Sequence, residues 1–356
     1  MKVLVRADAS ALIGTGHLMR CLTLALKLRE GGHEVTFVAR HITQNLAGLL
    51  AGKNFPLKKL GKAKEQNLNE TNHSAWLGVS VADDAEETGE TVGGGFDWVV
   101  VDHYALNSSW HMAARKIGKK IMVIDDLGDR MLDADLLLDQ NFYAAPLKRY
   151  AKQISQSTKC LLGPEFALLR EEFALARQKT KLRTGKVGRI LIFYGGIDST
   201  GETLKAAEAA ADFGVFTDIV VGSSNPQLGA IRAFCGGKSN FRLHTDVTNM
   251  ADLMAGADFS FGAGGTSTWE RCALGLPALV TTVAENQEVV TKEAAVFGVQ
   301  WLAGSSEIVT AELLRRKATE LFQRPRELAD CSALAMKTVD TKGSARVVEA
   351  MVREQK

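Results

Sequence analysis

The stretch IGTGHLMRC, residues 13–21, places a histidine directly behind two glycines. His17 follows Gly14, Thr15 and Gly16 and stands at the predicted start of a helix. The positive end of a helix dipole disfavours a second proton on the ring, so an imidazole there can accept a proton near neutral pH. The glycines allow a ligand to approach the backbone closely. This pattern predicts a general base, although a loop histidine with no catalytic role also fits it.

A second stretch, GAGGTSTWE (262–270), has the composition of an anion site. Backbone amides at Gly264 and Gly265 can approach phosphate oxygens. Thr266 and Ser267 can cap the following helix or donate to phosphate, and Glu270 can accept from both hydroxyls of a ribose. A purely structural turn remains the alternative, because the spacings of dinucleotide and P-loop motifs are absent.

Two further loops carry candidate binding residues. YGGIDSTG (194–201) contains Gly195 and Gly196 and is a candidate anion site. AENQ (284–287) places Asn286 and Gln287 where they can bind a sugar or a base amide. Both loops can also be simple capped turns. Asp133 and Asp135 resemble a metal-binding DxD pair, but their place before a strand favours a turn, and no metal site is predicted.

Alternating apolar strands and amphipathic helices must position these residues. This rhythm is typical of parallel α/β folds. Strands are predicted at 2–8, 33–40, 96–104, 119–127, 134–142, 188–196, 217–222 and 240–246, with helices at 17–32, around 73–88 and at 202–213. Strand, glycine loop, helix and strand follow at 257–280, and helices close the chain.

Polar residues follow several strands of the first half. They are Asp8, Asp102, Asp125, Asp126, Asp139, Gln140 and Asn141. Ligands of open parallel sheets lie beyond the carboxyl ends of the strands, so the series favours a functional crevice. Loop starts and helix caps would explain any single aspartate equally well.

We therefore predict two Rossmann-like α/β domains that face each other across a cleft. The first, at 1–164, carries the base and has a polar excursion at 61–95. A helical linker follows at 165–187, and the second domain spans 188–356.

The composition restricts the partners. The net charge is +2, with no long run of either sign, so neither nucleic acid nor a membrane surface is expected as the main partner. The five cysteines are scattered, which predicts reduced thiols, no zinc site and a cytoplasmic protein without membrane insertion. The sequence carries no prediction of the oligomeric state.

Several motifs occur in one order along nearly the whole chain. They are RADAS-ALIGTGHLMRCLTLA, VVVDHY, IDDL, LLGPEFALLREEF, YGGID, GAGGTSTWERCALGLP and AENQ. Together they resemble the UDP-2,4-diacetamido-2,4,6-trideoxy-β-L-altropyranose hydrolases of the pseudaminic acid pathway, which supplies flagellin glycosylation. This family is similar in fold to the GT-B glycosyltransferases, in particular the one that makes lipid II, and to spore-coat polysaccharide proteins.

The resemblance implies that water attacks the anomeric carbon of a UDP-sugar with inversion, without a metal or other cofactor. His17 would be the base, and Gly14–Gly16 would leave room for the sugar and diphosphate. The helix after GAGG would hold the UDP phosphates, and Glu270 would hold the ribose. Asn286 and Gln287 would face the sugar. Further partners of its acetamido groups or of the phosphates would be Tyr104, Asn141 and Arg170.

Two other functions remain open. A GT-B glycosyltransferase would use the same UDP site and pass the sugar to an acceptor hydroxyl. A non-catalytic sensor of nucleotide sugars would bind without releasing UDP, and the presence of His17 argues against it.

Overall fold

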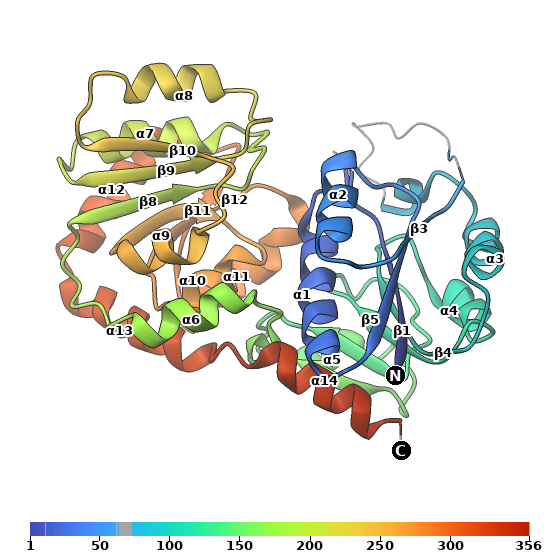
Figure 1. The fold of residues 1–356 in the computed structure, drawn as a ribbon. Coiled ribbons are helices and arrows are strands. Elements are labelled where there is room, and N and C mark those ends of the chain that lie inside the picture. The colour runs from blue at the N-terminus through green and yellow to red at the C-terminus, as the bar shows by residue number, and fades with distance from the viewer. Residues whose placement is uncertain (11, 62, 64–72, 356) are drawn as a thin grey trace. The chain divides into compact units, whose positions relative to one another are not determined.

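The computed structural model describes residues 1–10, 12–61, 63 and 73–355. They form two compact units, each built on one parallel sheet (Figure 1). The first unit comprises Met1–Asn141, Ala145–Leu168 and Lys342–Lys356, and the second comprises Phe142–Ala144 and Leu169–Thr341. Within the predicted excursion at 61–95, residues 62 and 64–72 lie outside the described part of the chain.

The sheet of the first unit has the strand order β3-β2-β1-β4-β5-β6-β7. Its strands are β1 (Lys2–Ala7), β2 (Glu34–Ala39), β3 (Leu57–Lys59), β4 (Phe96–Asp102), β5 (Gly118–Ile124), β6 (Leu136–Asp139) and β7 (Lys159–Leu162). The predicted strands of this half are confirmed. The sequence did not predict β3 and β7, which are short strands at the two edges of the sheet and therefore have weak apolar patterns.

The helices of the first unit are α1 (Gly16–Glu30), α2 (Gln44–Gly52), α3 (Val81–Val92), α4 (Ser108–Ala114), α5 (Pro146–Tyr150) and α14 (Gly343–Arg353), with 3-10 turns η1 (His73–Leu77) and η2 (Pro164–Phe166). The helix expected around 73–88 is divided into η1 and α3. Gly78 adopts φ +72° between them, and the Ser80 hydroxyl caps α3 by accepting from the Asp83 amide at 3.1 Å.

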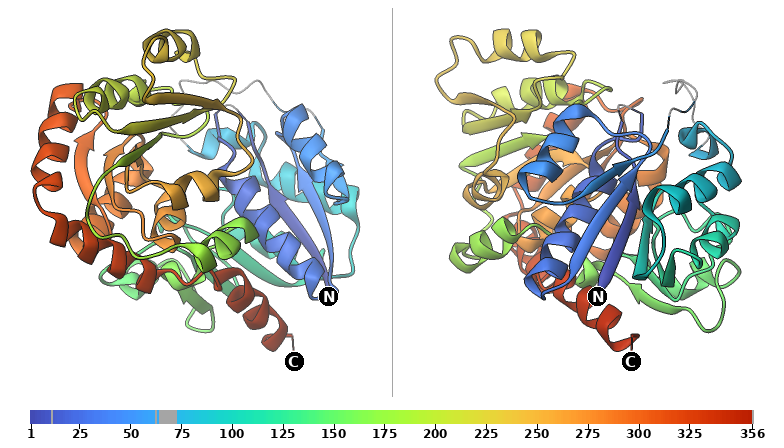
Figure 2. Two further views of the ribbon diagram at one scale, coloured as in Figure 1. Left: turned by 60° about the vertical axis from the view of Figure 1, so that its left-hand side comes forward. Right: turned by 45° about the vertical axis from the view of Figure 1, so that its right-hand side comes forward.

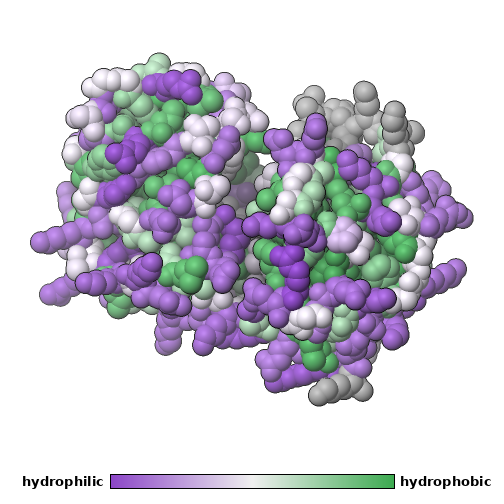
Figure 3. All heavy atoms as spheres, in the orientation of Figure 1, coloured by the Kyte–Doolittle hydropathy of each residue, from purple (hydrophilic) through white to green (hydrophobic). Residues whose placement is uncertain are grey.

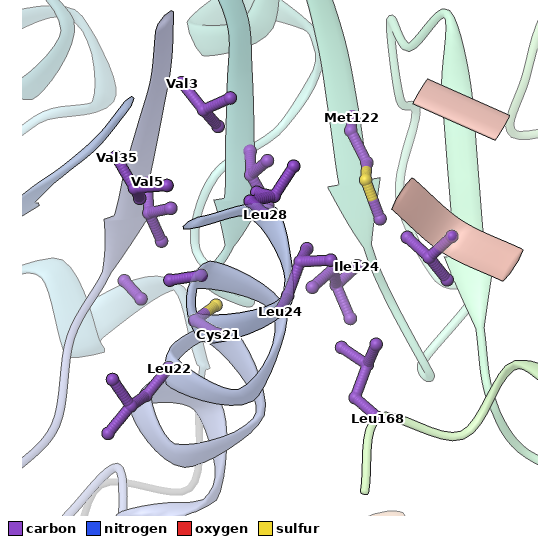
Figure 4. Close-up of a cluster of buried hydrophobic side chains, with 14 of the residues drawn as sticks. Val3, Val5, Cys21, Leu22, Leu24, Leu28, Val35, Met122, Ile124 and Leu168 are labelled. Carbon is purple, nitrogen blue, oxygen red and sulfur yellow. The ribbon is translucent and has the colours of Figure 1, made fainter. Parts of the chain in front are cut away.

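Helix α1 packs its apolar face against the first sheet (Figure 4). Leu24 and Leu28 are fully buried in one core with Val5 of β1 and Ile124 of β5. Each such leucine contributes about 1.5–3 kcal/mol through burial. The helix stops at Gly31, and Gly32 has φ +76°, which favours glycine. This packing holds the first turn of α1 beside the carboxyl ends of β1 and β4.

The C-terminal helix α14 packs with the first unit, whereas the sequence predicted one second domain to residue 356. Val347 and Met351 of α14 are fully buried in the core that α1 also joins, and Figure 2 shows the two helices side by side. At Gly343 a Cβ would collide with the backbone of Ala167, so α14 begins in close contact with the η2 segment. An amphipathic pattern does not specify which apolar surface covers it.

The segment predicted as a linker at 165–187 is divided between the units at Leu168. Its helix α6 (Glu171–Lys179) is part of the second unit: Phe173 is fully buried, and Arg177 donates to the carbonyls of Met336 and Val339 at 2.7 and 2.9 Å. Phe142 also belongs to the second unit, where its ring stacks on that of Phe297 with centroids 4.1 Å apart.

The second sheet has the order β10-β9-β8-β11-β12-β13. Its strands are β8 (Arg189–Phe193), β9 (Phe216–Val221), β10 (Phe241–Thr245), β11 (Phe259–Ala263), β12 (Ala278–Thr282) and β13 (Trp301–Ser305). Besides α6, its helices are α7 (Glu202–Ala211), α8 (Leu228–Cys235), α9 (Met250–Gly256), α10 (Ser267–Ala273), α11 (Glu288–Phe297), α12 (Ala311–Phe322) and α13 (Pro325–Thr338), with the turn η3 (Glu285–Gln287). The predicted strands and helices of this half are confirmed, and β13 is an additional edge strand.

Hydrophilic side chains cover much of the face of each unit that Figure 3 shows, with smaller apolar areas between them. Among the described helices, none is both long and apolar enough to cross a bilayer.

Candidate functional site

His17 is the second residue of α1, at the carboxyl edge of the first sheet. Gly14 adopts φ +79°, and its amide closes a turn by donating to the Ser10 carbonyl at 2.8 Å. Thr15 occupies the N-cap, and its side chain makes no capping bond to the helix. Gly16 begins the helix, so the turn directs the chain from β1 into α1 and leaves His17 only 7% exposed.

An aspartate from the neighbouring strand orients the His17 ring. Nδ1 of His17 lies 2.6 Å from Oδ1 of Asp102, the last residue of β4. Because a carboxylate only accepts hydrogen bonds, the proton of this bond resides on Nδ1. Nε2 then presents its lone pair, and no described residue has a hydrogen bond to it. A neutral histidine in this tautomer can accept a proton from a reactant.

Arg20 completes the support of the ring. It lies one helical turn after His17 and donates to both oxygens of Asp102, at 2.6 and 2.7 Å, and to Asp126 at 3.0 Å. Burial alone would raise the pKa of Asp102, but the charge of Arg20 and the hydrogen bonds from Arg20 and His17 outweigh it and hold the pKa well below its usual range. Asp102 therefore stays ionised and keeps the proton on Nδ1.

Tyr104 lies edge-on to the His17 ring, with centroids 4.5 Å apart. Its hydroxyl is hydrogen-bonded to Asp126, and burial together with that carboxylate raises the pKa of Tyr104 well above its usual value. His73 and Trp76 of η1 contact Tyr104 with centroid distances of 4.9 and 5.6 Å. The predicted residues His17 and Tyr104 are thus brought together beside an aromatic cluster.

The other strand-end aspartates serve different partners. Asp8 binds Arg6 at 2.5 Å, and Asp125 binds Arg130 at 2.7 Å. Asp139 accepts from the Tyr150 hydroxyl at 2.8 Å, and burial, with the charge of Asp126, raises its pKa to about 8. Of the predicted series, Asp102 and Asp126 belong to the cluster around His17.

Asn141 follows β6 and is buried, and its backbone N–H donates to the Asp139 carboxylate at 2.9 Å. Gln140 accepts through Oε1 from the Leu168 amide at 3.0 Å. These contacts stabilise the end of β6.

In the second unit, the loops after β8, β11 and β12 lie at one sheet edge because these strands are neighbours. Gly195 has φ +91°, and the carbonyl of Gly196 accepts from the Gly222 amide at 2.8 Å. Gly264 packs against Gln287, whose Oε1 lies 3.2 Å from the position of a Cβ there, and Gly265 has φ +85°. Thr266 and Ser267 begin α10, and Asn286 is exposed in η3. The structure therefore brings Gln287 to the glycine loop.

Glu270 and Arg170 form an ion pair at 3.1 Å within the second unit. The Glu270 side chain is 14% exposed. Burial raises the pKa of Glu270, and the charge of Arg170 opposes that rise. Arg170 also binds Glu172 at 2.5 Å. These contacts orient Glu270 and leave one of its oxygens outside the pair.

Sequence reasoning missed Arg20 and named Asp102 and Asp126 only as residues that follow strands. Arg20 carried a usable signal, since residues three apart share one helix face. The pairing of His17 with Asp102 depends on the register of β1 beside β4, in which Ala7 lies opposite Asp102. A single sequence does not show that register.

Asp133 and Asp135 both bind Arg115, at 2.9 Å each. Both carboxylates are therefore bound to an arginine, within the turn that precedes β6. Among the described residues, no group of three or more His, Cys, Asp or Glu is arranged to hold a metal ion.

The chain matches no family model. It is 27% identical to the UDP-2,4-diacetamido-2,4,6-trideoxy-beta-L-altropyranose hydrolase of Campylobacter jejuni over 255 residues, which cover 71% of this chain and 81% of the relative. It is 28% identical over 165 residues to the spore coat polysaccharide biosynthesis protein SpsG of Bacillus subtilis, which is 45% of this chain and 48% of SpsG. The chain thus spans about half the length of SpsG. The resemblance expected from the motifs is confirmed.

Solved structures show the fold. MurG of Acinetobacter baumannii superimposes with a TM-score of 0.68 at 15% identity, over 99% of both chains. The glycotransferase of kitacinnamycin superimposes with a TM-score of 0.63 at 16% identity, over 100% of this chain and 99% of that one. The predicted fold class, two parallel-sheet α/β domains of the GT-B type, is confirmed.

Proposed function

We propose that this protein is an enzyme of nucleotide-sugar processing, and specifically a hydrolase that releases UDP from UDP-2,4-diacetamido-2,4,6-trideoxy-β-L-altrose. The observation that carries the reaction type is the His17–Asp102–Arg20 arrangement, in which a buried ion pair orients a histidine at the start of a helix. The substrate follows from the Campylobacter relative. The product would feed pseudaminic acid biosynthesis in the cytoplasm.

In this reaction the first unit supplies the base. Nε2 of His17 takes a proton from water while the water oxygen forms a bond to the anomeric carbon. Asp102 keeps Nδ1 protonated and stabilises the imidazolium that forms, as a carboxylate partner of a catalytic histidine does. The bond from the anomeric carbon to the phosphate oxygen breaks, its electron pair leaves with UDP, and attack from the opposite face inverts the centre.

The second unit would bind UDP. Amides of the loops at Gly195–Gly196 and Gly264–Gly265 are suited to the diphosphate, whose developing charge must be stabilised as UDP departs. Glu270, oriented by Arg170, would accept from the ribose hydroxyls. Gln287 would contact the sugar beside the glycine loop, with Asn286 next to it. Tyr104 and Asn141 of the first unit would contact the acetamido groups. The reaction needs no metal or other cofactor in this scheme.

The direct test is proton NMR of the purified protein with the UDP-linked sugar, run beside His17→Ala. We expect UDP and free sugar, with the α anomer first, from the wild-type protein and none from a folded variant. A substrate that persists with the wild-type protein would contradict the proposal.

A GT-B glycosyltransferase is the second candidate, because the solved neighbours include a glycotransferase. His17 would then deprotonate an acceptor hydroxyl in place of water. Sugar transfer to an added acceptor that outruns hydrolysis would favour this alternative.

A further inference from the structure

Arg271 is a buried cation of the second unit without an anionic partner. It is 2% exposed, and no carboxylate of the described residues lies within ion-pair distance of its guanidinium. The neighbouring Glu270 interacts with the charge of Arg271 at longer range, but its close ion pair is with Arg170. Burying a charge without a counter-charge costs several kcal/mol, so an arginine in this state needs an explanation.

The guanidinium lies against the glycine loop. Nη2 donates to the carbonyl of Ala263 and to the hydroxyl of Thr268, both at 3.1 Å, and to Oε1 of Gln300 at 3.4 Å. Nη1 donates to the Ser267 hydroxyl at 3.3 Å. All four acceptors are neutral, so they satisfy the donors of the guanidinium without cancelling its charge.

Arg183 shows what a purely structural buried arginine looks like in the same unit. It is 9% exposed and donates to the carbonyls of Met254 and Ala257 at 2.8 Å and to that of Leu274. These carbonyls end α9 and α10, where the helix dipole is negative and favours a cation. Arg271 reaches back toward the first turn of α10, where the dipole is positive and disfavours a cation.

A second buried group at the same loop also lacks a partner. The Thr291 hydroxyl has no hydrogen-bond partner among the described residues, and Thr291 is 1% exposed. It lies so close to Gly264 that a Cβ added there would collide with it. A buried hydroxyl without a partner and a cation without an anion therefore meet at one loop.

We propose that Arg271 is a positioning residue for the diphosphate of the nucleotide sugar: its uncompensated charge, held behind the 262–268 loop, makes that loop attract the phosphates and stabilises the departing UDP. This inference rests on the proposed function and assigns a role to a residue that the sequence did not single out. Acting through the loop, the charge favours the dianionic phosphates and is indifferent to the uridine moiety.

The experiment compares UDP with uridine by calorimetric titration of the full-length protein. Loss of the charge in Arg271→Met should weaken UDP at least about tenfold and leave uridine within about twofold, on the scale of one charge interaction in partly buried protein. Arg271→Lys, which keeps the charge, should recover most of the UDP affinity. Arg183→Met is the matched control. We expect it to lower the melting temperature and to leave the ratio of UDP to uridine affinity unchanged.

Gln300→Glu tests the same idea without removing the arginine. It places a carboxylate behind the loop, within reach of the guanidinium, so it should weaken UDP selectively in a folded protein. If Arg271→Met does not fold, this variant decides. The inference is overturned if both variants leave the ratio unchanged, or if Arg183→Met shifts it as much. A wild-type protein that binds neither ligand overturns the inference and the UDP site together, whereas UDP binding without sugar release overturns only the proposed reaction.

Discussion

His17 and His103 are both buried histidines beside an aspartate at one edge of the first sheet, yet they use their ring nitrogens in opposite ways. His17 directs Nδ1 at Asp102 and leaves Nε2 without a described partner. His103 accepts the Ala105 amide at Nδ1, at 3.1 Å, and turns Nε2 toward Asp8 at 3.3 Å. Nδ1 of His103 is therefore used by the backbone, and its buried Nε2 faces the Asp8 carboxylate without forming a hydrogen bond to it, whereas Nε2 of His17 has no described partner.

Each histidine is also next to a buried network of arginines and aspartates. Asp84 accepts from Arg6, Arg40 and Trp110, each at 2.9 Å, in a buried network that Asp8 connects to His103. The network around His17 also consists of an arginine and aspartates. Its Asp102 binds Nδ1 of His17, whose Nε2 has no described partner. The comparison shows that the two clusters share residue types and burial, and that they differ in what the second ring nitrogen faces: a carboxylate at His103 and no described partner at His17.

The largest expected effect is on activity at His17. His17→Ala should lower kcat by about 10²–10⁴-fold, the usual contribution of a general base, with UDP affinity retained. The measurement is sugar release by NMR together with calorimetric UDP binding.

The matched control is His103→Gln, which should keep kcat within about threefold for the folded protein. A variant at His103 that loses activity as completely as His17→Ala would show that the two histidines do not have separate roles.

Asp84→Asn should have the next largest effect, and it should be on stability. It leaves the buried Arg6 and Arg40 with too little negative charge, and breaking a buried ion pair costs about 3–5 kcal/mol of unfolding free energy. Urea denaturation measures that loss, and kcat of the remaining folded protein should not change. A stable but inactive variant would refute the division between the two clusters.

Asp102→Asn should lower kcat by about 10–100-fold, the scale for removing the residue that orients a functional histidine. The amide no longer holds the proton on Nδ1 as strongly, while the substrate contacts persist, so KM should stay the same. The pH profile of kcat should shift as well, which a general loss of packing would not cause. An unchanged profile would argue against an orienting role for Asp102.

The smallest expected effect is the pH dependence of stability at His103. Burial lowers the pKa of His103, so the folded protein keeps this ring neutral while the unfolded chain protonates it below about pH 6.5. The contribution of neutral His103 to the free energy of unfolding is therefore complete above that pH. It is lost as the pH falls, by at most about 1.4 kcal/mol per pH unit. His111 responds in the same direction, since burial lowers its pKa to about 3. His103→Gln should therefore reduce the acid sensitivity in urea titrations without removing it, and an unchanged slope would contradict the assignment.

Local patterns were enough to predict several features. Apolar runs followed by polar residues identified most strands, because a strand buried on both faces of a parallel sheet must be apolar throughout. The glycines at 14 and 16 located His17 at a helix start, and those at 264 and 265 located a loop between strand and helix. Edge strands such as β3 were not predicted, because few of their residues are buried and their apolar pattern is weak.

The sequence by itself determined the two-sheet α/β architecture, the position of His17 on its helix and the glycine loops, since each depends on neighbours a few residues away. Only the tertiary structure decided that Asp102 and Arg20 hold His17, that Arg271 stays without a counter-charge, and that α14 covers the first unit. The physical reason is that these contacts depend on strand register and on which apolar faces meet. Sequence periodicity states that a face is buried and does not state what buries it.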